Sequence, residues 1–294
     1  LQESGVVLDD GVTLRLAEDR FLVSCSSGHT DAVRMRLELW RQDRFDPAHV
    51  VVHDTTAQWA TLTITGPRSR DLIEAAGLEI ALDDQSLPHM AFATGAFDGG
   101  PLRIARVSFT GDRSYELSVP ARCASSLRAR LWEKLPAFGG GLLGLEALMI
   151  LRAEKGFIVV GKDTDGTTMP HDLGVGGPRD SRRDEYIGKR SLFMPVALDP
   201  RRKQLVGLSV ASGEAPLPTG AHVAMGAARA RRSQGYVTSS YMSPTLGRPI
   251  ALGLIEAGLS RTGETVGVVH LGAERRAAIV SPVALDPEGN RLHA

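Results

Sequence analysis

A single arginine at the end of an apolar segment is the first residue that could do chemistry. Arg152 follows residues 145–151, whose apolar side chains have mixed helical spacing, so we expect a helix that carries a cation at its end. A guanidinium in this setting either forms a structural ion pair with Glu146 or Glu154 or holds an anionic ligand. Taken alone, the residues favour the ion pair.

Two carboxylates are further candidates. Glu116 stands between Tyr115 and Leu117 in a β pattern and points to the opposite face from both, so a surface position is the simpler interpretation. Its two oxygens could also accept hydrogen bonds from two adjacent N–H donors of a ligand. Asp9 and Asp10 form an acidic turn, where aspartates usually cap the backbone. A partly desolvated carboxylate could instead orient an amine or move its proton.

Other chemistry finds little support in the sequence. There is no glycine-rich dinucleotide motif, no phosphate loop and no HExxH motif, so an autonomous nucleotide or zinc enzyme is not expected. Cys25 and Cys123 are far apart and lack CxxC spacing, which indicates neither a metal site nor a disulfide framework. His171 is interpreted as structural. Tyr241 is a weaker candidate for contact with a ligand.

The elements that position these residues alternate between strands and helices. Segment 5–16 is predicted to be a hairpin with Asp9, Asp10 and Gly11 at its tip. The remaining predicted helices lie at 30–40, 68–76 and 121–135. The remaining predicted strands lie at 21–24, 49–52, 60–65, 91–98, 102–110, 157–160, 205–210, 222–225, 234–238, 249–255, 265–271 and 277–280.

Composition sets broad limits on the function. The chain has 294 residues, of which 43% are hydrophobic, and this is enough for two or three globular domains with a buried core. Its 34 basic and 34 acidic residues cancel, so the charge balance favours neither a nucleic-acid nor a membrane partner. Neither a bilayer-spanning apolar run nor a signal peptide is found, and we expect a reducing, cytoplasmic setting. The absent initiator Met indicates a piece of a longer polypeptide.

Several segments together resemble one protein family. GLEALMILRAEKGFIVVGKDTDGTTMPHDLG, from Gly144 to Gly174, is similar to RLEAG…LYGxDxDxxxTPxExGL of glycine-cleavage aminomethyltransferases, the T-proteins. It resembles more closely the folate domain at the C-terminal end of the alpha subunit of heterotetrameric sarcosine oxidase, in which LRAEKGF, DTDGT and PHDLG occur. WATLTITGPRSRDLI, GDRSYELSVP and GYVTSSYMSPTLGRPIALGLI are also similar to family segments and occur in the same order.

The resemblance implies a fold. It is an α+β fold, with ferredoxin-like α/β units of the aminomethyltransferase folate-binding fold followed by a small C-terminal β-barrel. The implied domains are the remainder of an N-terminal folate-binding subdomain at 1–48, the ferredoxin-like folate-binding domain at 49–200 and the barrel domain at 201–294.

The resemblance also implies a function with tetrahydrofolate as the cofactor. In the family the arginine equivalent to Arg152 holds the glutamyl tail, the glutamate equivalent to Glu116 bonds the amino-pyrimidine edge of the pterin, and the aspartate equivalent to Asp9 lies by the reacting part. A one-carbon unit from the oxidative demethylation of sarcosine would be captured as methylene-tetrahydrofolate. The oxidoreductase chemistry on the CH–NH bond, with FAD, FMN and NAD, would belong to the rest of the oxidase. Its beta, gamma and delta subunits would be the partners.

The sequence departs from the family at two places. T-proteins carry VNAAN where this chain has VSCSSG at 23–28, and Arg113 and Ser114 replace an acidic residue and a glycine before Glu116. The first departure favours the sarcosine-oxidase branch. The alternatives are a T-protein, a dimethylglycine dehydrogenase-like aminomethyltransferase, and a non-catalytic subunit-contact module that holds no ligand.

Overall fold

The chain folds into two compact units whose segments alternate along the sequence. The computed structural model describes residues 1–176, 184–225 and 232–294. The barrel unit contains Leu1–Gly11, Cys25–His29 and Met149–Pro287. The sheet unit contains Val12–Ser24, Thr30–Leu148 and Glu288–Ala294. Each unit therefore draws residues from more than one of the three predicted domain segments.

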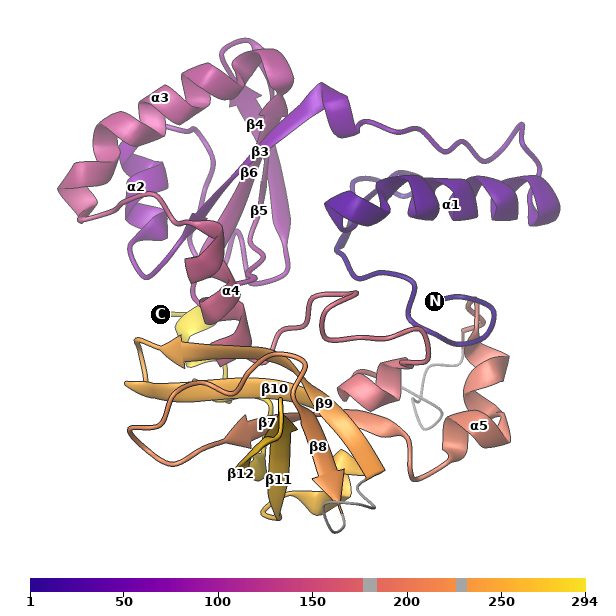
Figure 1. Cartoon of the computed structure of the whole chain (residues 1–294). Coiled ribbons are helices and arrows are strands. Elements are labelled where there is room, and N and C mark those ends of the chain that lie inside the picture. Colours follow the sequence, from indigo (N-terminus) through magenta and orange to yellow (C-terminus); the bar gives the residue numbers. More distant parts are fainter. Residues whose placement is uncertain (177–183, 226–231) are drawn as a thin grey trace. The chain divides into compact units, whose positions relative to one another are not determined.

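The sheet unit is built on four antiparallel strands, which are β3 (Trp59–Thr65), β4 (Phe92–Phe97), β5 (Gly100–Ala105) and β6 (Ser114–Pro120). Their order in the sheet is β3-β6-β5-β4. Helices α2 (Ser69–Ala75) and α3 (Ala124–Lys134) lie against one face (Figure 1). Tyr115, Leu117 and Val119 alternate along β6 and are fully buried in the core that these helices share.

The rest of the sheet unit is less buried. Strands β1 (Thr13–Arg15) and β2 (Phe21–Val23) pair with each other. Helix α1 (Thr30–Arg44) follows and contains no buried residue. No helix in the described part of the chain combines the length and the apolar composition needed to cross a membrane.

The barrel unit takes its name from six antiparallel strands that close into a barrel in the order β10-β7-β12-β11-β8-β9 (Figure 1). Side chains from all six strands fill its interior, Val237 and Ile279 among them. The strands are β7 (Lys203–Ser209), β8 (His222–Met225), β9 (Arg232–Ser243), β10 (Arg248–Glu256), β11 (Thr265–His270) and β12 (Ala273–Val280).

Helix α4 (Leu145–Glu154) brings the central stretch of the sequence onto the barrel. Ala153 joins a cluster outside the barrel interior that also contains Tyr241 and Leu252, and Met149 packs against it. The chain then passes through the short helices η5 (Pro170–Leu173), η6 (Lys189–Phe193) and α5 (Pro195–Leu198). The predicted helix that ends in a cation is thus confirmed, and its last turn is buried.

The predicted α+β class with a C-terminal barrel is confirmed. The predicted hairpin tip at residues 9–11 is wrong, because the turn between β1 and β2 lies at 16–20, where the Leu16 amide donates to the Arg20 carbonyl. The predicted strands at 49–52 and 157–160 are also wrong. Segment 49–52 has no partner strand in the described part of the chain. In segment 157–160, the Val159 amide donates its hydrogen bond to the Asp163 carboxylate and not to a neighbouring strand.

We expect the core of the sheet unit to depend strongly on Leu117, which is fully buried between strands and helices. Replacing Leu117 with Ala should lower the free energy of unfolding by about 2–5 kcal/mol, because the change loses buried area and leaves a cavity. Urea unfolding measures this change. The control is Leu145→Ala, which alters a side chain that is 79% exposed and should stay within about 0.5 kcal/mol of the parent.

Candidate functional site

Glu116 lies on the face of the sheet that is opposite the core. It pairs with Thr63 of β3 on one side and with Ala105 of β5 on the other, so it occupies the middle of the sheet. Its strand neighbours Tyr115 and Leu117 point into the core, as the alternation predicts. From the sequence, a surface position and a ligand-binding role were both open for Glu116, and in the structure its side chain is half-buried.

The carboxylate of Glu116 has no compensating partner among the residues that the structure describes. Burial raises its pKa above the ordinary value, and no hydrogen bond or ion pair joins it to another residue in the described part of the chain. A half-buried carboxylate without hydrogen-bond donors destabilises the fold, because its charge is partly removed from water and no protein group replaces the lost hydration. Such a group is ready to accept N–H donors from a ligand.

Arg152 is fully buried, and its guanidinium contacts residues of the barrel unit. One NH group donates to the Asp163 carboxylate and, at 3.0 Å, to the Phe157 carbonyl. The other NH group donates to Ser239 Oγ at 2.7 Å. The expected ion pair exists, but the predicted partners are wrong: Glu154 bonds the hydroxyls of Ser243 and Thr245 instead.

Asp163 completes this buried network. Its carboxylate also accepts hydrogen bonds from Thr238 Oγ1 at 2.5 Å, from Ser239 Oγ at 2.7 Å and from the Val159 amide at 3.0 Å. Arg152 Nε is buried and has no partner among the described residues. A ligand anion could therefore reach Arg152 through Nε, through the second N–H of the nitrogen that bonds Ser239, or by displacing Asp163.

Asp9 is held by two donors. Its side chain is 6% exposed and accepts a hydrogen bond from the Ser26 amide at 2.7 Å. His29 Nδ1 lies 2.9 Å from the other carboxylate oxygen. Burial alone would raise the pKa of Asp9, but the hydrogen bonds from His29 and Ser26 outweigh it and hold the pKa below its ordinary value. Sequence reasoning missed His29, because no motif connects it to a residue twenty positions earlier.

Tyr241 is 9% exposed and belongs to the cluster that α4 packs against. Its hydroxyl oxygen accepts a hydrogen bond from Lys162 Nζ at 2.7 Å. Tyr241, Arg152 and Asp9 all lie in the barrel unit, whereas Glu116 lies in the sheet unit. Ser239, which Arg152 bonds, and Tyr241 are two residues apart on β9, so their side chains lie on the same face of that strand.

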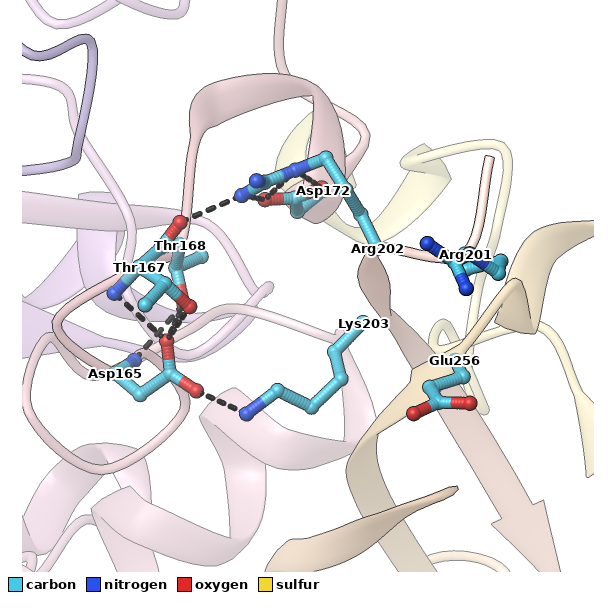
Figure 2. Close-up of a pocket in the computed structure, with 8 residues that line it drawn as sticks. All are labelled: Asp165, Thr167, Thr168, Asp172, Arg201, Arg202, Lys203 and Glu256. Carbon is cyan, nitrogen blue, oxygen red and sulfur yellow. Dashed lines mark hydrogen bonds and ion pairs between the residues drawn. The ribbon is translucent and has the colours of Figure 1, made fainter. Parts of the chain in front are cut away.

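A cavity of about 200 Å³ in the barrel unit contains none of the predicted site residues (Figure 2). Four of its charged side chains are already paired, Lys203 with Asp165 and Arg202 with Asp172. Burial would raise the pKa of Asp165, but Lys203 and the Thr167 donors hold it well below the ordinary value. We therefore interpret the cavity as part of a structural ion-pair network. It is lined by Asp165, Thr167, Thr168, Asp172, Arg201, Arg202, Lys203 and Glu256.

The departure from the family at Arg113 has a structural explanation. Arg113 is 4% exposed, and its guanidinium donates to Asp84 at 2.9 Å and to the backbone oxygens of His293 and Ala294. Hydrogen bonds from Arg113, together with Arg106, hold the pKa of Asp84 well below its ordinary value. The arginine thus fixes residues 291–294 beside the start of β6. Among the described residues, no group of three or more His, Cys, Asp or Glu side chains could hold a metal ion.

Comparison with known families identifies the class of protein. Residues 1–177 match the GCVT N-terminal domain, and residues 203–286 match the glycine cleavage T-protein C-terminal barrel domain. The first match covers more than half of the chain and ends shortly before the strands of the barrel begin. The chain therefore belongs to the glycine cleavage T-protein family.

Similar proteins fall into two groups. The sarcosine oxidase alpha subunit of Corynebacterium sp. strain P-1 is 38% identical over 98% of this chain and 30% of its own length. That of Rhizobium meliloti is 35% identical over 100% and 30%. The aminomethyltransferase of Mycobacterium tuberculosis is 29% identical over 95% of this chain and 72% of its own length. The chain thus spans about 30% of the length of the sarcosine oxidase alpha subunits that it matches.

A solved structure shares the fold. The glycine cleavage system aminomethyltransferase T from Bartonella henselae superposes with a TM-score of 0.80 and 24% sequence identity. The superposition covers 98% of this chain and 74% of that protein. The α+β architecture with its barrel is therefore that of the aminomethyltransferases.

Breaking the buried pair between Arg152 and Asp163 should destabilise the protein. We expect Arg152→Met and Asp163→Asn each to lower the free energy of unfolding by about 3–5 kcal/mol, because each leaves a charge or its donors buried without a partner. The double variant should lose less than the sum. Urea unfolding tests this, with Arg201→Met in an exposed pair as the control, which should barely move the midpoint. An unchanged Arg152→Met midpoint would contradict the structural role.

Replacing Glu116 with Gln should stabilise the protein at neutral pH. Because burial raises the pKa of Glu116, the folded state binds its proton more tightly than the unfolded state does. The ionised group therefore costs stability above the raised pKa, and the cost disappears as the pH falls toward the unfolded value of 4.5. Urea midpoints should be higher for Glu116→Gln at pH 7, and the difference should shrink on acidification. A difference that does not vary with pH would contradict this assignment.

Proposed function

We propose that this chain is the tetrahydrofolate-binding part of a sarcosine oxidase alpha subunit. In this role it captures, as methylene-tetrahydrofolate, the one-carbon unit that oxidative demethylation of sarcosine releases. Two alpha subunits that match almost the whole chain at 35% and 38% identity support this branch of the family. The structural observation that carries the proposal is the half-buried carboxylate of Glu116, to which no described residue donates a hydrogen bond.

Glu116 fits the pterin in its chemistry. The amino-pyrimidine edge of a pterin offers adjacent N–H donors, and a carboxylate offers two acceptor oxygens in a matching arrangement. Because no residue in the described part of the chain donates to Glu116, a ligand that supplies these donors would remove the cost of its burial. The free energy of unfolding that burial of Glu116 lowers in the free protein would then be restored in the complex.

Asp9, Arg152 and Tyr241 have different proposed roles. Asp9 would lie beside the reacting amines, and its lowered pKa keeps it ionised at neutral pH, so it can orient a proton donor. Arg152 would influence the glutamyl tail mainly by fixing α4 and Ser239, since three of its five N–H donors are already bonded to Asp163, Phe157 and Ser239. Tyr241 would line the same region of the barrel unit.

Catalysis in this proposal is mostly positioning. Bound tetrahydrofolate supplies two amine nitrogens that take up a carbon at the oxidation level of formaldehyde. The chain contributes by holding that carbon and the amines in one place, which replaces a bimolecular encounter with an intramolecular one. The oxidation, with FAD, FMN and NAD, and the beta, gamma and delta partner subunits belong to the remainder of the proposed oxidase.

A second candidate function is aminomethyl transfer of the T-protein or dimethylglycine dehydrogenase type. The Mycobacterium tuberculosis aminomethyltransferase, which this chain matches over 72% of that protein's length, supports it. The VSCSSG segment at residues 23–28 opposes the T-protein branch. A subunit-contact module without a ligand is a third candidate, and Glu116 opposes it, since a contact surface needs no buried lone carboxylate.

Calorimetric titration with tetrahydrofolate under anaerobic conditions tests the proposal. The chain should bind at micromolar concentration, and Glu116→Ala should weaken binding by at least about tenfold, because each charge-assisted hydrogen bond contributes about 1.5–3 kcal/mol. The control is Glu79→Ala, which removes an exposed glutamate from the same unit. No binding, or equal loss in both variants, would sink the folate assignment.

A further inference from the structure

Residues 1–7, which lead to Asp9, are bonded to later segments of the same barrel unit. Ser191 Oγ donates to the Glu3 carbonyl, and the Val7 amide donates to the Thr168 carbonyl at 2.9 Å. Gly188 has a φ of 86° and lies so close that a Cβ there would be 2.4 Å from the Gln2 carbonyl oxygen. Only glycine fits this position, so the N-terminal backbone packs closely against the chain at Gly188.

The hydrogen bond between Asp9 and His29 Nδ1 fixes the orientation of the imidazole ring. The lowered pKa of Asp9 means that its carboxylate is ionised at neutral pH and can only accept hydrogen bonds. His29 Nδ1, at 2.9 Å, must therefore carry the proton of that hydrogen bond. Nε2 is then the basic nitrogen, and no hydrogen bond to Nε2 is formed within the described part of the chain.

Exposure separates the roles of the two side chains. Asp9 is 6% exposed and has little free surface with which to meet a substrate. His29 is 38% exposed, at the end of the short helix η1 (Ser27–His29), and can present Nε2 to a bound molecule. A buried carboxylate behind an accessible imidazole is an arrangement that orients a histidine for proton transfer.

We infer that His29 is the acid–base group of the one-carbon site and that Asp9 is its positioning residue. This inference rests on the proposed folate function. It moves the proton transfer from Asp9, which sequence reasoning selected, to the imidazole that Asp9 orients. Ser26 has a supporting role, because its amide occupies the second carboxylate oxygen and keeps Asp9 ionised.

The proton balance of the reaction defines what His29 does. Capture of formaldehyde by two amines forms two C–N bonds, breaks the C=O bond and releases one water, with no change in oxidation state. Two amine protons leave with the carbonyl oxygen. His29 Nε2 accepts one of these protons and then delivers it to the departing oxygen, so the imidazole returns to its starting state.

Nuclear magnetic resonance tests the orientation without any ligand. In long-range ¹H–¹⁵N spectra of the full chain at neutral pH, His29 should show the tautomer protonated at Nδ1, and its signal is assigned by its loss in His29→Ala. Asp9→Asn should shift His29 toward the tautomer protonated at Nε2. A wild-type His29 protonated at Nε2, or an unchanged tautomer in Asp9→Asn, would overturn the inference.

Transfer rates test the role in chemistry. The measured rate is that at which the full chain joins formaldehyde to tetrahydrofolate, above the protein-free reaction. His29→Ala should lower it by about 10²–10⁴-fold while folate binding by calorimetry is unchanged, and added imidazole should restore part of it. The matched control is His49→Ala, which removes an 82% exposed histidine that also pairs with an aspartate through Nδ1 and should leave the rate unchanged.

The outcomes separate this inference from the proposed function. Normal folate binding with an unchanged rate in His29→Ala would overturn the role of His29 and leave the folate assignment standing. Absence of folate binding by the wild-type chain would overturn the proposed function and, with it, this inference. Loss of rate without imidazole rescue, accompanied by loss of folate binding, would show a structural role for His29 and also overturn it.

Discussion

The buried ion pair between Arg152 and Asp163 is the interaction on which the barrel unit depends most. It joins the last turn of α4, the loop at residues 157–163 and strand β9, because the same two groups also bond Phe157 and Ser239. Its neighbours in the sequence are used in the same way: Glu154 bonds Thr245, and Lys155 bonds Asp286. The charges of the RAEKGF segment therefore form a junction with the barrel, which explains why charged residues occur inside an apolar helix end.

The charged side chains that hold the fold together differ from the candidate functional ones in their hydrogen-bond and ion-pair partners. Every charge of that junction has a carboxylate, a hydroxyl or a carbonyl as its partner. In the cavity of Figure 2, Lys203 pairs with Asp165 and Arg202 with Asp172. Glu116 differs, because burial raises its pKa and nothing in the described part of the chain compensates it. His29 differs in another way, since one ring nitrogen is bonded and the other is accessible. Within the described part of the chain, Glu116 and the Nε2 atom of His29 therefore each keep a position at which a ligand can form a hydrogen bond.

The sequence predicted elements with a strong local pattern and missed those that depend on distant contacts. The alternation around Glu116 predicted β6 and its core face, and the six strands of the barrel could be located from apolar runs between turns. The apolar run at 49–52 was predicted as a strand and is wrong, because a strand also needs a neighbour to pair with. The Asp163 partner of Arg152 and the His29 partner of Asp9 were missed for the same reason. Both contacts exist only once the chain has folded.

The central claim is that Glu116 recognises a pterin, and a crystal structure of the full chain with tetrahydrofolate tests it most directly. We expect the amino-pyrimidine edge to lie on the Glu116 carboxylate with two hydrogen bonds of about 2.7–2.9 Å. The Arg152–Asp163 pair should remain closed in the complex. A folate bound elsewhere, with Glu116 still without a partner, would contradict the account. So would a complex in which Arg152 leaves Asp163 to bind the glutamyl tail, since the pair would then serve the ligand and not the fold.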